Sequence, residues 1–393
     1  MFMAQTRRSL LKVAAVSPLA AAAAKSGLKE IQVYSKLGVK PVINGMGTVT
    51  VLGGSLMPPE VLQAMDEAAK SFVPMPELQR KAGARIAELL GVPGAMVTGG
   101  AASGITVATV ACLCRGDQKK LQQLPDVTGM PYEVIQQKAH HSGYEHQITL
   151  TGAKVIEVET AEELQAAIGP KTAMMFFLNK HDPDGKIKRE EWLRIAKNNN
   201  ILTFNDAAAD VPPKERLWQY VKEGFDLVAF SGGKGMQGPQ SAGLLLGRKD
   251  LIDASFPAMS PAGGIGRGMK VAKEEIIGMV AALERFLKLD HTAEAQLLDK
   301  RVAEMIAGLG KVKGVKTSKY VPVIANELPH FLMEWDESIV GLKTQQIVEK
   351  LQKGDPPIHV LPEGPGRMVV SVWMMTGDQH RVVAKRLADI LRG

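Results

Sequence analysis

The chain has 393 residues, of which 45% are hydrophobic and 23% are charged, an ordinary composition for a globular protein of one large or two smaller domains. Its formal net charge is +7, but residues 1–25 contain Arg7, Arg8, Lys12 and Lys25 and no acid, which leaves +3 for the rest. This near-neutral remainder argues against a nucleic-acid-binding protein.

The first 25 residues have the order of an export signal. A basic start containing TRRSLLK is followed by an apolar run, Val13 to Ala24, that is too short to span a membrane. The adjacent arginines resemble the twin-arginine signal of bacterial export. We expect residues 1–25 to be such a signal and the protein to be periplasmic; the alternative is an Ala-rich N-terminal helix.

After an arm at residues 26–60, short apolar runs alternate with helical patterns. Helices are expected over residues 58–72 and 79–91, the second closed by Gly91, and again after each of the apolar runs 94–98, 133–138, 154–158 and 173–179. This alternation predicts a largely parallel sheet covered by helices, in a large domain at 61–268. The runs 227–230 and 243–246 have no helix between them and are expected to pair antiparallel.

The pattern changes towards the C-terminus. A long amphipathic helix starting near Met269 is expected to link the large domain to a small α+β domain, the two together covering residues 269–393. Its first two strands are expected at 321–328 and 330–335, followed by a helix, two more strands and a last helix. Cys112 and Cys114, separated by one residue, are predicted to be buried small side chains on a helix rather than a disulfide or a zinc site.

The stretch GKGMQG, residues 233–238, satisfies the G-x-G-x-x-G pattern of a dinucleotide-binding loop. That loop must join a strand to a helix, whereas Pro239 and a strand-like run follow here. The glycines instead leave Lys234 free to move at the end of a buried strand. The alternative, a nicotinamide dehydrogenase, requires that GKGMQG lie between a strand and a helix after all.

Two further features give Lys234 a chemical role. Asp206 ends a strand 28 residues earlier, and the segment 97–104 (VTGGAASG) leads through glycines into a helix whose N-terminus suits a phosphate. A lysine for an imine, a carboxylate for a pyridine nitrogen and a phosphate cup are the parts that hold pyridoxal 5′-phosphate (PLP). The sequence therefore predicts a PLP site.

The chain resembles fold-type-I PLP enzymes of the selenocysteine synthase-like branch, which includes the D-glucosaminate-6-phosphate ammonia-lyases. The resemblance is carried by segments such as VTGGAASGITVATVACL, FNDAAADVPP, GGIGRGMK and, most specifically, FSGGKGMQGPQSAG. It implies an α/β fold-type-I transferase fold, with a mostly parallel seven-stranded sheet between helices and a small C-terminal α+β domain. It also implies a homodimer or larger assembly.

Position by position, the resemblance assigns Lys234 as the Schiff-base lysine and Asp206 as the partner of the pyridine nitrogen. His140, or else His141, would stack on the PLP ring; the alternative is that this pair belongs to a polar loop. The remaining expected cofactor contacts are Gly99, Gly100, Ala101, Ser103, Ser231 and Gln240. Arg267 and Lys270 match basic family positions and are expected to bind a substrate carboxylate or phosphate, a role also considered for Arg367 without a supporting motif.

The expected reaction is elimination at the α-carbon of an amino acid or amino sugar acid, releasing ammonia and a 2-keto acid. Racemisation is the first alternative, followed by a selenium or sulfur transferase and a PLP-binding protein without catalysis. The expected partner is a small amino acid substrate. Transfer to tRNA is not expected because the net positive charge is small, and an exported enzyme would not meet cytoplasmic sugar phosphates.

Overall fold

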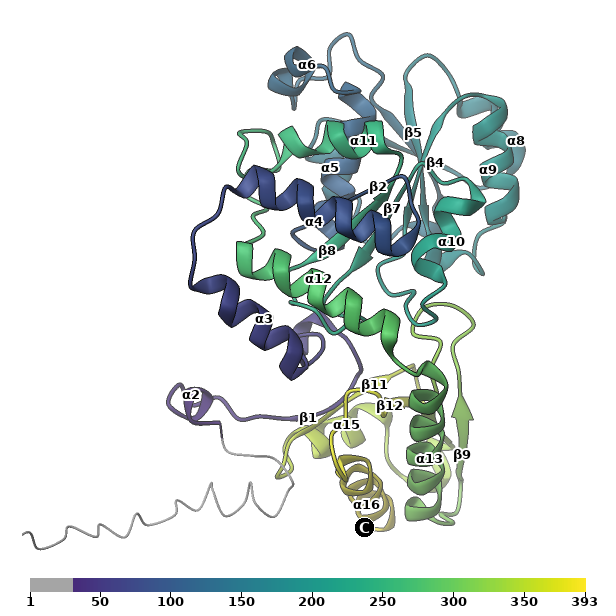
Figure 1. The fold of residues 1–393 in the computed structure, drawn as a ribbon. Helices are drawn as coiled ribbons and strands as arrows, with labels where there is room; N and C mark the ends of the chain where they lie inside the picture. The colour runs from purple at the N-terminus through teal and green to yellow at the C-terminus, as the bar shows by residue number, and fades with distance from the viewer. Residues whose placement is uncertain (1–30) are drawn as a thin grey trace, which may run out of the picture. The chain divides into compact units, whose positions relative to one another are not determined.

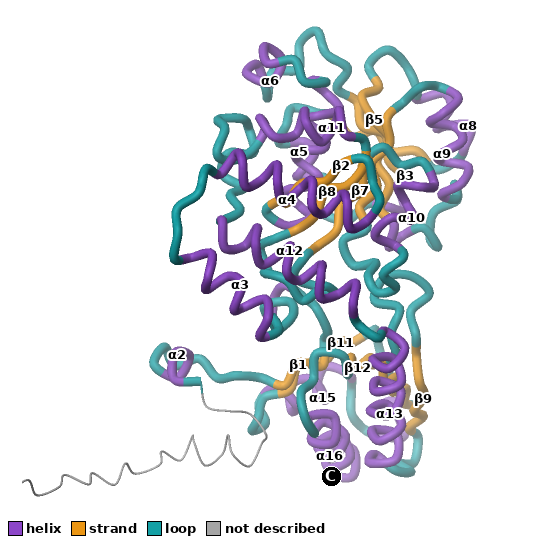
Figure 2. The backbone as a smooth tube through the Cα atoms, in the orientation of Figure 1, coloured by secondary structure: helices purple, strands orange, loops and turns teal. Residues whose placement is uncertain are grey.

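The computed structural model describes residues 31–393, which form two compact units (Figures 1 and 2). Unit 2 comprises residues 47–297 and 321–329, and unit 1 comprises the described residues up to 46 together with 298–320 and 330–393. The predicted signal at residues 1–25 lies outside the described residues. Among those described, no helix is both long and apolar enough to cross a bilayer.

Unit 2 is built on a seven-stranded sheet with the order β2-β8-β7-β6-β5-β3-β4. β8 runs antiparallel to both β2 and β7, and all other neighbours are parallel. This confirms the mostly parallel sheet and the antiparallel final pair. Its strands are β2 (Gly94–Thr98), β3 (Glu133–Gln137), β4 (Lys154–Val158), β5 (Thr172–Leu178), β6 (Leu202–Asp206), β7 (Leu227–Ser231) and β8 (Gly243–Gly247).

The centre of unit 2 is apolar on every side. β5, with the sequence TAMMFFL, is buried along its whole length, as expected for a strand covered on both faces. Helix α5 (Gly100–Cys114) contacts β5, β6, β7 and β8, and every residue from Ser103 to Cys114 is buried. The prediction for Cys112 and Cys114 is thus confirmed, and burial raises the pKa of their thiols to about 12 and about 11.

The other helices of unit 2 surround this centre. α4 packs on β2, α12 on α3 and α4, α9 on β6, and α10 on β7. α4 ends as predicted at Gly91, whose φ of 62° is in the left-handed region that glycine adopts easily. These helices are α3 (Pro59–Ala69), α4 (Met75–Leu90), α6 (Gln118–Gln123), α7 (His146–Thr149), α8 (Ala161–Ala167), α9 (Arg189–Asn198), α10 (Arg216–Glu223), α11 (Lys249–Ser255) and α12 (Lys273–Lys288).

Unit 1 contains a five-stranded sheet with the order β1-β11-β12-β10-β9. β1 pairs parallel with β11, and the other pairs are antiparallel. The strands are β1 (Ile43–Gly45), β9 (Val315–Tyr320), β10 (His330–Trp335), β11 (Ile358–Pro362) and β12 (Arg367–Ser371). The helices that begin or lie in this unit are α2 (Gln32–Ser35), α13 (His291–Leu309, which starts in unit 2), α14 (Glu337–Val340), α15 (Thr344–Gln352) and α16 (Gln379–Arg392).

Two expectations for the C-terminal part differ from this structure. The predicted strand at 321–328 is wrong: these residues form a loop, and the strand that precedes β10 is β9, whose alternating half-exposed side chains hide it from a search for apolar runs. The predicted linking helix corresponds to α12, which falls within unit 2, where it packs on α3 and α4. The compact units therefore do not divide at residue 268.

Candidate active site

The ends of several strands of unit 2 meet at one edge of its sheet. Ser231 of β7 and Thr98 of β2 both pair with Gly243 of β8. Asp206 pairs with Ala229, two residues before Ser231 in the parallel neighbour β7. The loops that follow β2, β6 and β7 therefore start side by side, at the edge where open α/β sheets bind ligands.

Asp206 and Lys234 lie close enough at this edge to interact electrostatically. Asp206 is 3% exposed, and within residues 31–393 its carboxylate accepts a single hydrogen bond, from the Ala208 N–H at 3.0 Å. Burial raises the pKa of Asp206, although the Lys234 ammonium opposes that shift. Burial likewise lowers the pKa of Lys234, against the effect of Asp206. A buried carboxylate and a half-buried amine with weakened charge form a reactive pair.

The predicted phosphate cup is the first turn of α5. Gly99 precedes the helix, Gly100 has a φ of +83°, and no side chain caps the helix N-terminus. The first N–H groups of a helix have no partner within it, so this end can bind an anion. Ser103 adds a buried Oγ without a hydrogen-bond partner in the described part of the chain. Ala101 is also buried there.

Backbone contacts place the cup directly against Gly243, the residue that follows the lysine loop, residues 232–242. A Cβ added at Gly243 would lie 2.6 Å from the carbonyl carbon of Gly100 and 2.8 Å from the nitrogen of Ala101. Only glycine permits this approach, because real Cβ atoms do not come so close to a backbone. The sequence-predicted cup and lysine therefore belong to one site.

The lysine loop itself is fixed by hydrogen bonds. Gly233 O accepts from both the backbone N–H and the Oγ of Ser55, at 3.0 and 2.9 Å. Ser231, half-buried, donates its N–H to Ala208 O at 3.3 Å, which ties β7 to the turn after Asp206. Gln240 is exposed, and its side chain lies over Gly233. Ser55 was not predicted, because nothing in its local sequence indicates this long-range contact.

The two histidines have different surroundings. His140 is fully buried; its Nδ1 accepts from Leu178 N–H at 3.2 Å, its Nε2 lies 3.2 Å from Gln137 Nε2, and its ring meets Phe177 edge to face. Burial, with a contribution from His181, lowers its pKa to about 4. His141 is exposed and lies 3.1 Å from Glu157. These contacts favour a structural role for His140, and stacking on PLP stays a prediction for either residue.

The backbone segment of the predicted basic residues Arg267 and Lys270 lies at this edge, but among the described residues no contact of their side chains with the cup is seen. The carbonyl oxygens of Met269 and Lys270 lie 3.1 and 3.5 Å from the position of a Cβ on Gly99, so this segment passes over the cup. The side chains of Lys270 and Arg267 are exposed, and Arg267 Nη1 lies 3.4 Å from Ser260 Oγ. Their backbone thus lies beside the cup, whereas substrate binding by them stays a prediction.

Arg367 lies in β12 of unit 1 and is already paired. Its Nη1 is 2.8 Å from Glu334 Oε1 and its Nε is 3.0 Å from Glu363 Oε2. A guanidinium held between two carboxylates offers less to a substrate carboxylate than a free one. The considered substrate-binding role of Arg367 therefore has no support from its contacts and stays a prediction.

A second acid near the site escaped the sequence analysis. Asp210, four residues after Asp206, is 1% exposed, and its Oδ2 accepts from Asn179 Nδ2 and from Tyr220 OH, the latter at 2.9 Å. It interacts electrostatically with both Asp206 and Lys234. Its place in the segment DAAAD was the available signal, but one acid after a short turn is not distinctive by itself.

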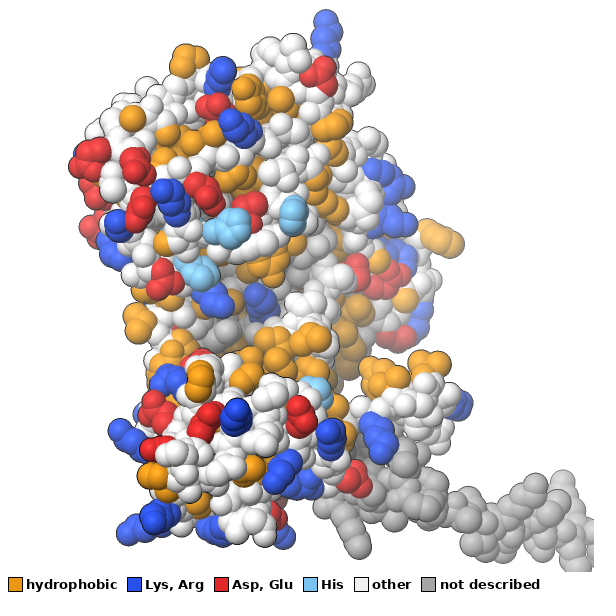
Figure 3. Space-filling model, turned by 180° about the vertical axis from the view of Figure 1, so that it is seen from behind, with side chains coloured by type: hydrophobic (Ala, Val, Ile, Leu, Met, Phe, Trp, Pro, Cys, Tyr) orange, Lys and Arg blue, Asp and Glu red, His pale blue; other side chains and the backbone are white. Residues whose placement is uncertain are grey.

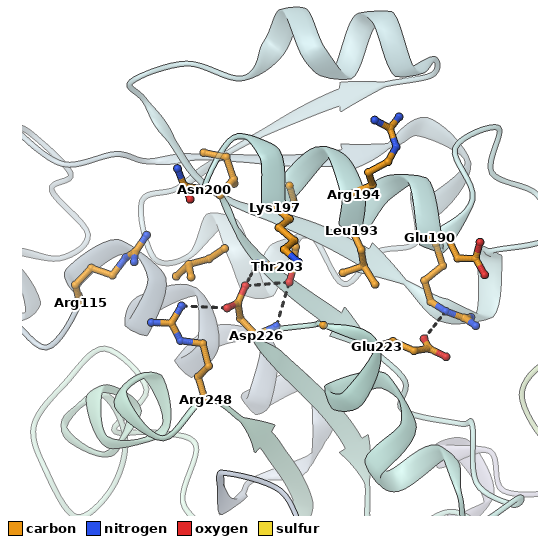
Figure 4. Close-up of a pocket in the computed structure, with 15 residues that line it drawn as sticks. Arg115, Glu190, Leu193, Arg194, Lys197, Asn200, Thr203, Glu223, Asp226 and Arg248 are labelled. Carbon is orange, nitrogen blue, oxygen red and sulfur yellow. Dashed lines mark hydrogen bonds and ion pairs between the residues drawn. The ribbon is translucent and has the colours of Figure 1, made fainter.

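A cavity of about 770 Å³ lies elsewhere in unit 2 (Figure 4). It runs between α9 and α10 towards the start of β6, and none of the predicted site residues lines it. Several of its charges are neutralised within it: Arg248 pairs with Asp226 at 3.1 Å (Figure 4), and Arg189 pairs with Glu223 at 2.9 Å. This cavity is not the candidate active site.

The residues at the carboxyl edge fit PLP. The unpartnered Ser103 Oγ and the uncapped end of α5 suit its phosphate, and the nearly unbonded Asp206 suits the protonated pyridine nitrogen. Lys234 supplies the amine within reach of the same groups.

Comparison with known proteins agrees with this site. The family described as aminotransferase class-V matches residues 55–276, which include both Lys234 and Asp206. D-glucosaminate-6-phosphate ammonia lyase of Salmonella typhimurium is 31% identical over 338 residues, covering 83% of this chain and 88% of the relative. A solved structure of a D-glucosaminate-6-phosphate ammonia-lyase matches with a TM-score of 0.78 and 27% identity, over 92% of this chain and 98% of that one.

Two further relatives show how far reactions diverge within the group. A 5′-C-glycyluridine monooxygenase-decarboxylase of Streptomyces sp is 28% identical over 373 residues, covering 91% of this chain and 92% of the relative. An L-seryl-tRNA(Sec) selenium transferase of Desulfotalea psychrophila is 27% identical over 261 residues, covering 58% of this chain and 53% of the relative. The resemblance to the selenocysteine synthase-like branch is confirmed at this level.

Proposed function

The chain belongs to the aminotransferase class-V family, and on that premise we propose that it eliminates ammonia from an amino acid or amino sugar acid carrying a leaving group on Cβ. Its standing as a PLP-dependent lyase rests on the ammonia-lyase relative and on the matching solved structure. The observation that carries the proposal is the Lys234–Asp206 pair, beside the uncapped end of α5 at one sheet edge.

The side chains of the site divide the work of holding the cofactor. The α5 N-terminus and Ser103 would bind the phosphate, and Asp206 would keep a proton on the pyridine nitrogen. When bound, PLP withdraws electrons from the substrate α-carbon, so that bonds to that carbon break more easily. Asp206 is suited to its part because its carboxylate is buried and has a single backbone donor, which leaves an oxygen for the ring N–H.

Lys234 is the proposed base. Its Nζ takes the α-proton, which requires a neutral amine near neutral pH. Burial supplies this condition by lowering the pKa of the ammonium, and the nearby Lys180 lowers it further. The flanking Gly233 and Gly235 let the side chain move between the cofactor and the substrate, while Ser55 holds the backbone of the loop in place.

The first substrates to test are amino sugar acids and β-hydroxy amino acids. The Salmonella relative is named for a phosphorylated amino sugar acid. Arg267 and Lys270 are cationic residues of the segment whose backbone passes over the cup. A substrate carrying a carboxylate or phosphate beyond its α-carboxylate is therefore proposed. Export, if it occurs, favours unphosphorylated members of this class.

The test is a panel of D- and L-amino acids and amino sugar acids incubated with the purified protein and PLP in deuterated water. Keto acid and ammonia in equal amounts are expected. Deuterium at Cα with loss of optical rotation and no ammonia would instead establish racemisation, and carbon dioxide release would point to the decarboxylating relative. A protein that binds PLP and changes no substrate would be a binding protein, contrary to the proposal.

We also propose that the chain is exported by the twin-arginine pathway and works as a homodimer or larger assembly in the periplasm. The basic TRRSLLK segment supports export, and the family resemblance supports assembly. Arg7→Lys together with Arg8→Lys is expected to retain the protein in the cytoplasm, measured by cell fractionation. Periplasmic protein at the parental level would contradict this, and a monomer by light scattering would contradict the assembly.

A further inference from the structure

Asp210 lies in a buried network that reaches from the active site into the body of unit 2. Asn179, directly after β5, donates to Asp210 Oδ2 and accepts from Arg189 Nη1 at 3.2 Å. Tyr220 of α10 donates its hydroxyl to the same Oδ2, at 2.9 Å. The guanidinium groups of Arg189 and Arg216 lie 5.2 and 5.7 Å from the centre of the Tyr220 ring. Two donors from separate elements thus hold one carboxylate oxygen, and the arginines surround these donors.

The backbone around Asp210 leads directly to the catalytic pair. Asp210 N–H donates to Ala207 O at 3.1 Å, closing the turn that begins at Asp206. Within this turn, Ala208 N–H bonds Asp206 Oδ1 and Ala208 O accepts from Ser231 N–H, three residues before Lys234. The side chain of Asp210 therefore anchors the turn that orients Asp206 and connects it to β7.

The second carboxylate oxygen of Asp210 has a different environment. Oδ1 is buried and has no hydrogen-bond partner among the described residues. Holding a carboxylate in this state is costly, and asparagine or a hydrophobic residue would fill the same position at a lower cost. The groups that act on its charge are Asp206, Arg216, Tyr220 and Lys234. The shape of the side chain therefore does not explain an aspartate at position 210, and we look for a role of its negative charge.

We propose that Asp210 is a positioning residue of the active site: it anchors the Asp206 turn and places a second negative charge beside Lys234. Its charge favours the protonated form at the Lys234 nitrogen and so opposes the effects of burial and of Lys180. Burial raises the pKa of Asp210 to about 6, so its carboxylate carries this charge above that pH. This inference rests on the proposed binding of PLP at Lys234.

The experiment is a pH titration of the visible absorption band of PLP bound to the full-length protein. In Asp210→Asn the shape is kept and the charge is lost, so the midpoint is expected to fall by about 0.5 to 1 pH unit. Tyr220→Phe removes one donor that stabilises the charge and should shift the midpoint in the same direction by less. Asp226→Asn, at the opposite edge of the sheet, serves as the matched control and should not shift it.

A midpoint unchanged in both Asp210→Asn and Tyr220→Phe would overturn the proposal and leave Asp210 a purely structural residue. If Asp210→Asn does not fold, judged by circular dichroism, the Tyr220→Phe titration decides alone. A parent protein without the band would refute PLP binding at Lys234 instead, which keeps the two failures distinguishable.

Discussion

Asp206 and Asp226 stand at opposite edges of the same sheet and have opposite surroundings. Asp226, just before β7, has both oxygens occupied: Oδ2 accepts from Thr203 N and Oγ1 at 2.8 and 3.0 Å, and Oδ1 from Arg248 at 3.1 Å. Asp206, at the end of β6, has one backbone donor and is more deeply buried. A carboxylate whose bonds are complete stabilises the fold, whereas one left incomplete in the interior is available to a ligand.

The same contrast holds for the charges around each edge. The cavity at the α9–α10 side is large, but three of its arginines, Arg189, Arg194 and Arg248, are paired with carboxylates. The carboxyl edge holds the half-buried amine of Lys234 and two buried acids, Asp206 and Asp210. On the face shown in Figure 3, acidic and basic side chains are interspersed. Incomplete bonding in the interior, not cavity volume, identifies the site.

Replacing the amine should have the largest effect. Lys234→Ala is expected to lower turnover by about a thousandfold or more, because both the cofactor's covalent partner and the base are lost. The visible band of bound PLP should disappear as well. Both readouts are taken on protein of unchanged circular dichroism. Retention of the band and the activity would show that another residue carries the chemistry.

Exchanging each aspartate for asparagine tests the comparison directly. Asp206→Asn should reduce turnover by roughly a hundredfold or more, since the pyridine nitrogen loses the negative charge that keeps it protonated. Asp226→Asn should instead cost about 1 to 3 kcal/mol of unfolding free energy by leaving donors unpaired. Turnover assays and urea unfolding of both variants separate the effects. Equal losses of activity in the two variants would show that Asp206 and Asp226 do not differ in catalytic role.

His140 provides a test of whether a buried polar group near the carboxyl edge stabilises the fold, as Asp226 does at the opposite edge. Its folded pKa of about 4 lies below the ordinary value of 6.5, so the unfolded chain binds the proton first as the pH falls. Between these values stability should decline with falling pH, by roughly 3 kcal/mol in total. In His140→Gln this component should be absent from urea unfolding measured at several pH values. If the unfolding free energy of His140→Gln falls with pH as steeply as that of the parent, a group other than His140 causes the decline.

Much of this site could be predicted because its parts are local in sequence. Lys234 among glycines, Asp206 at the end of an apolar run and the glycine turn before α5 each follow from a short pattern, and the alternation of elements predicts that they share an edge. Asp210, Asn179 and Ser55 could not be found in this way. Their roles depend on contacts between segments far apart in the chain, such as Ser55 with Gly233.

The errors have a similar origin. The loop at 321–328 is apolar enough to suggest a strand, but it belongs to unit 2, where Asn326 N–H bonds Ala209 O at 2.9 Å and Glu327 pairs with Arg216 at 3.0 Å. The loop is held by these tertiary contacts rather than by a β-ladder; Ala325 and Leu328 are buried, whereas Val321 and Val323 are exposed. Strand β9 was missed because its alternating exposure leaves few apolar positions.

The interleaving of the two units limits how the protein can be taken apart. Unit 1 takes β1 from residues 43–45, ahead of all of unit 2, and unit 2 takes residues 321–329 from between β9 and β10. Neither unit is therefore one continuous stretch of polypeptide. A fragment ending near residue 297 would lack the loop that bonds Ala209, and one beginning there would lack an edge strand, so dissection by truncation should yield pieces that misfold or aggregate.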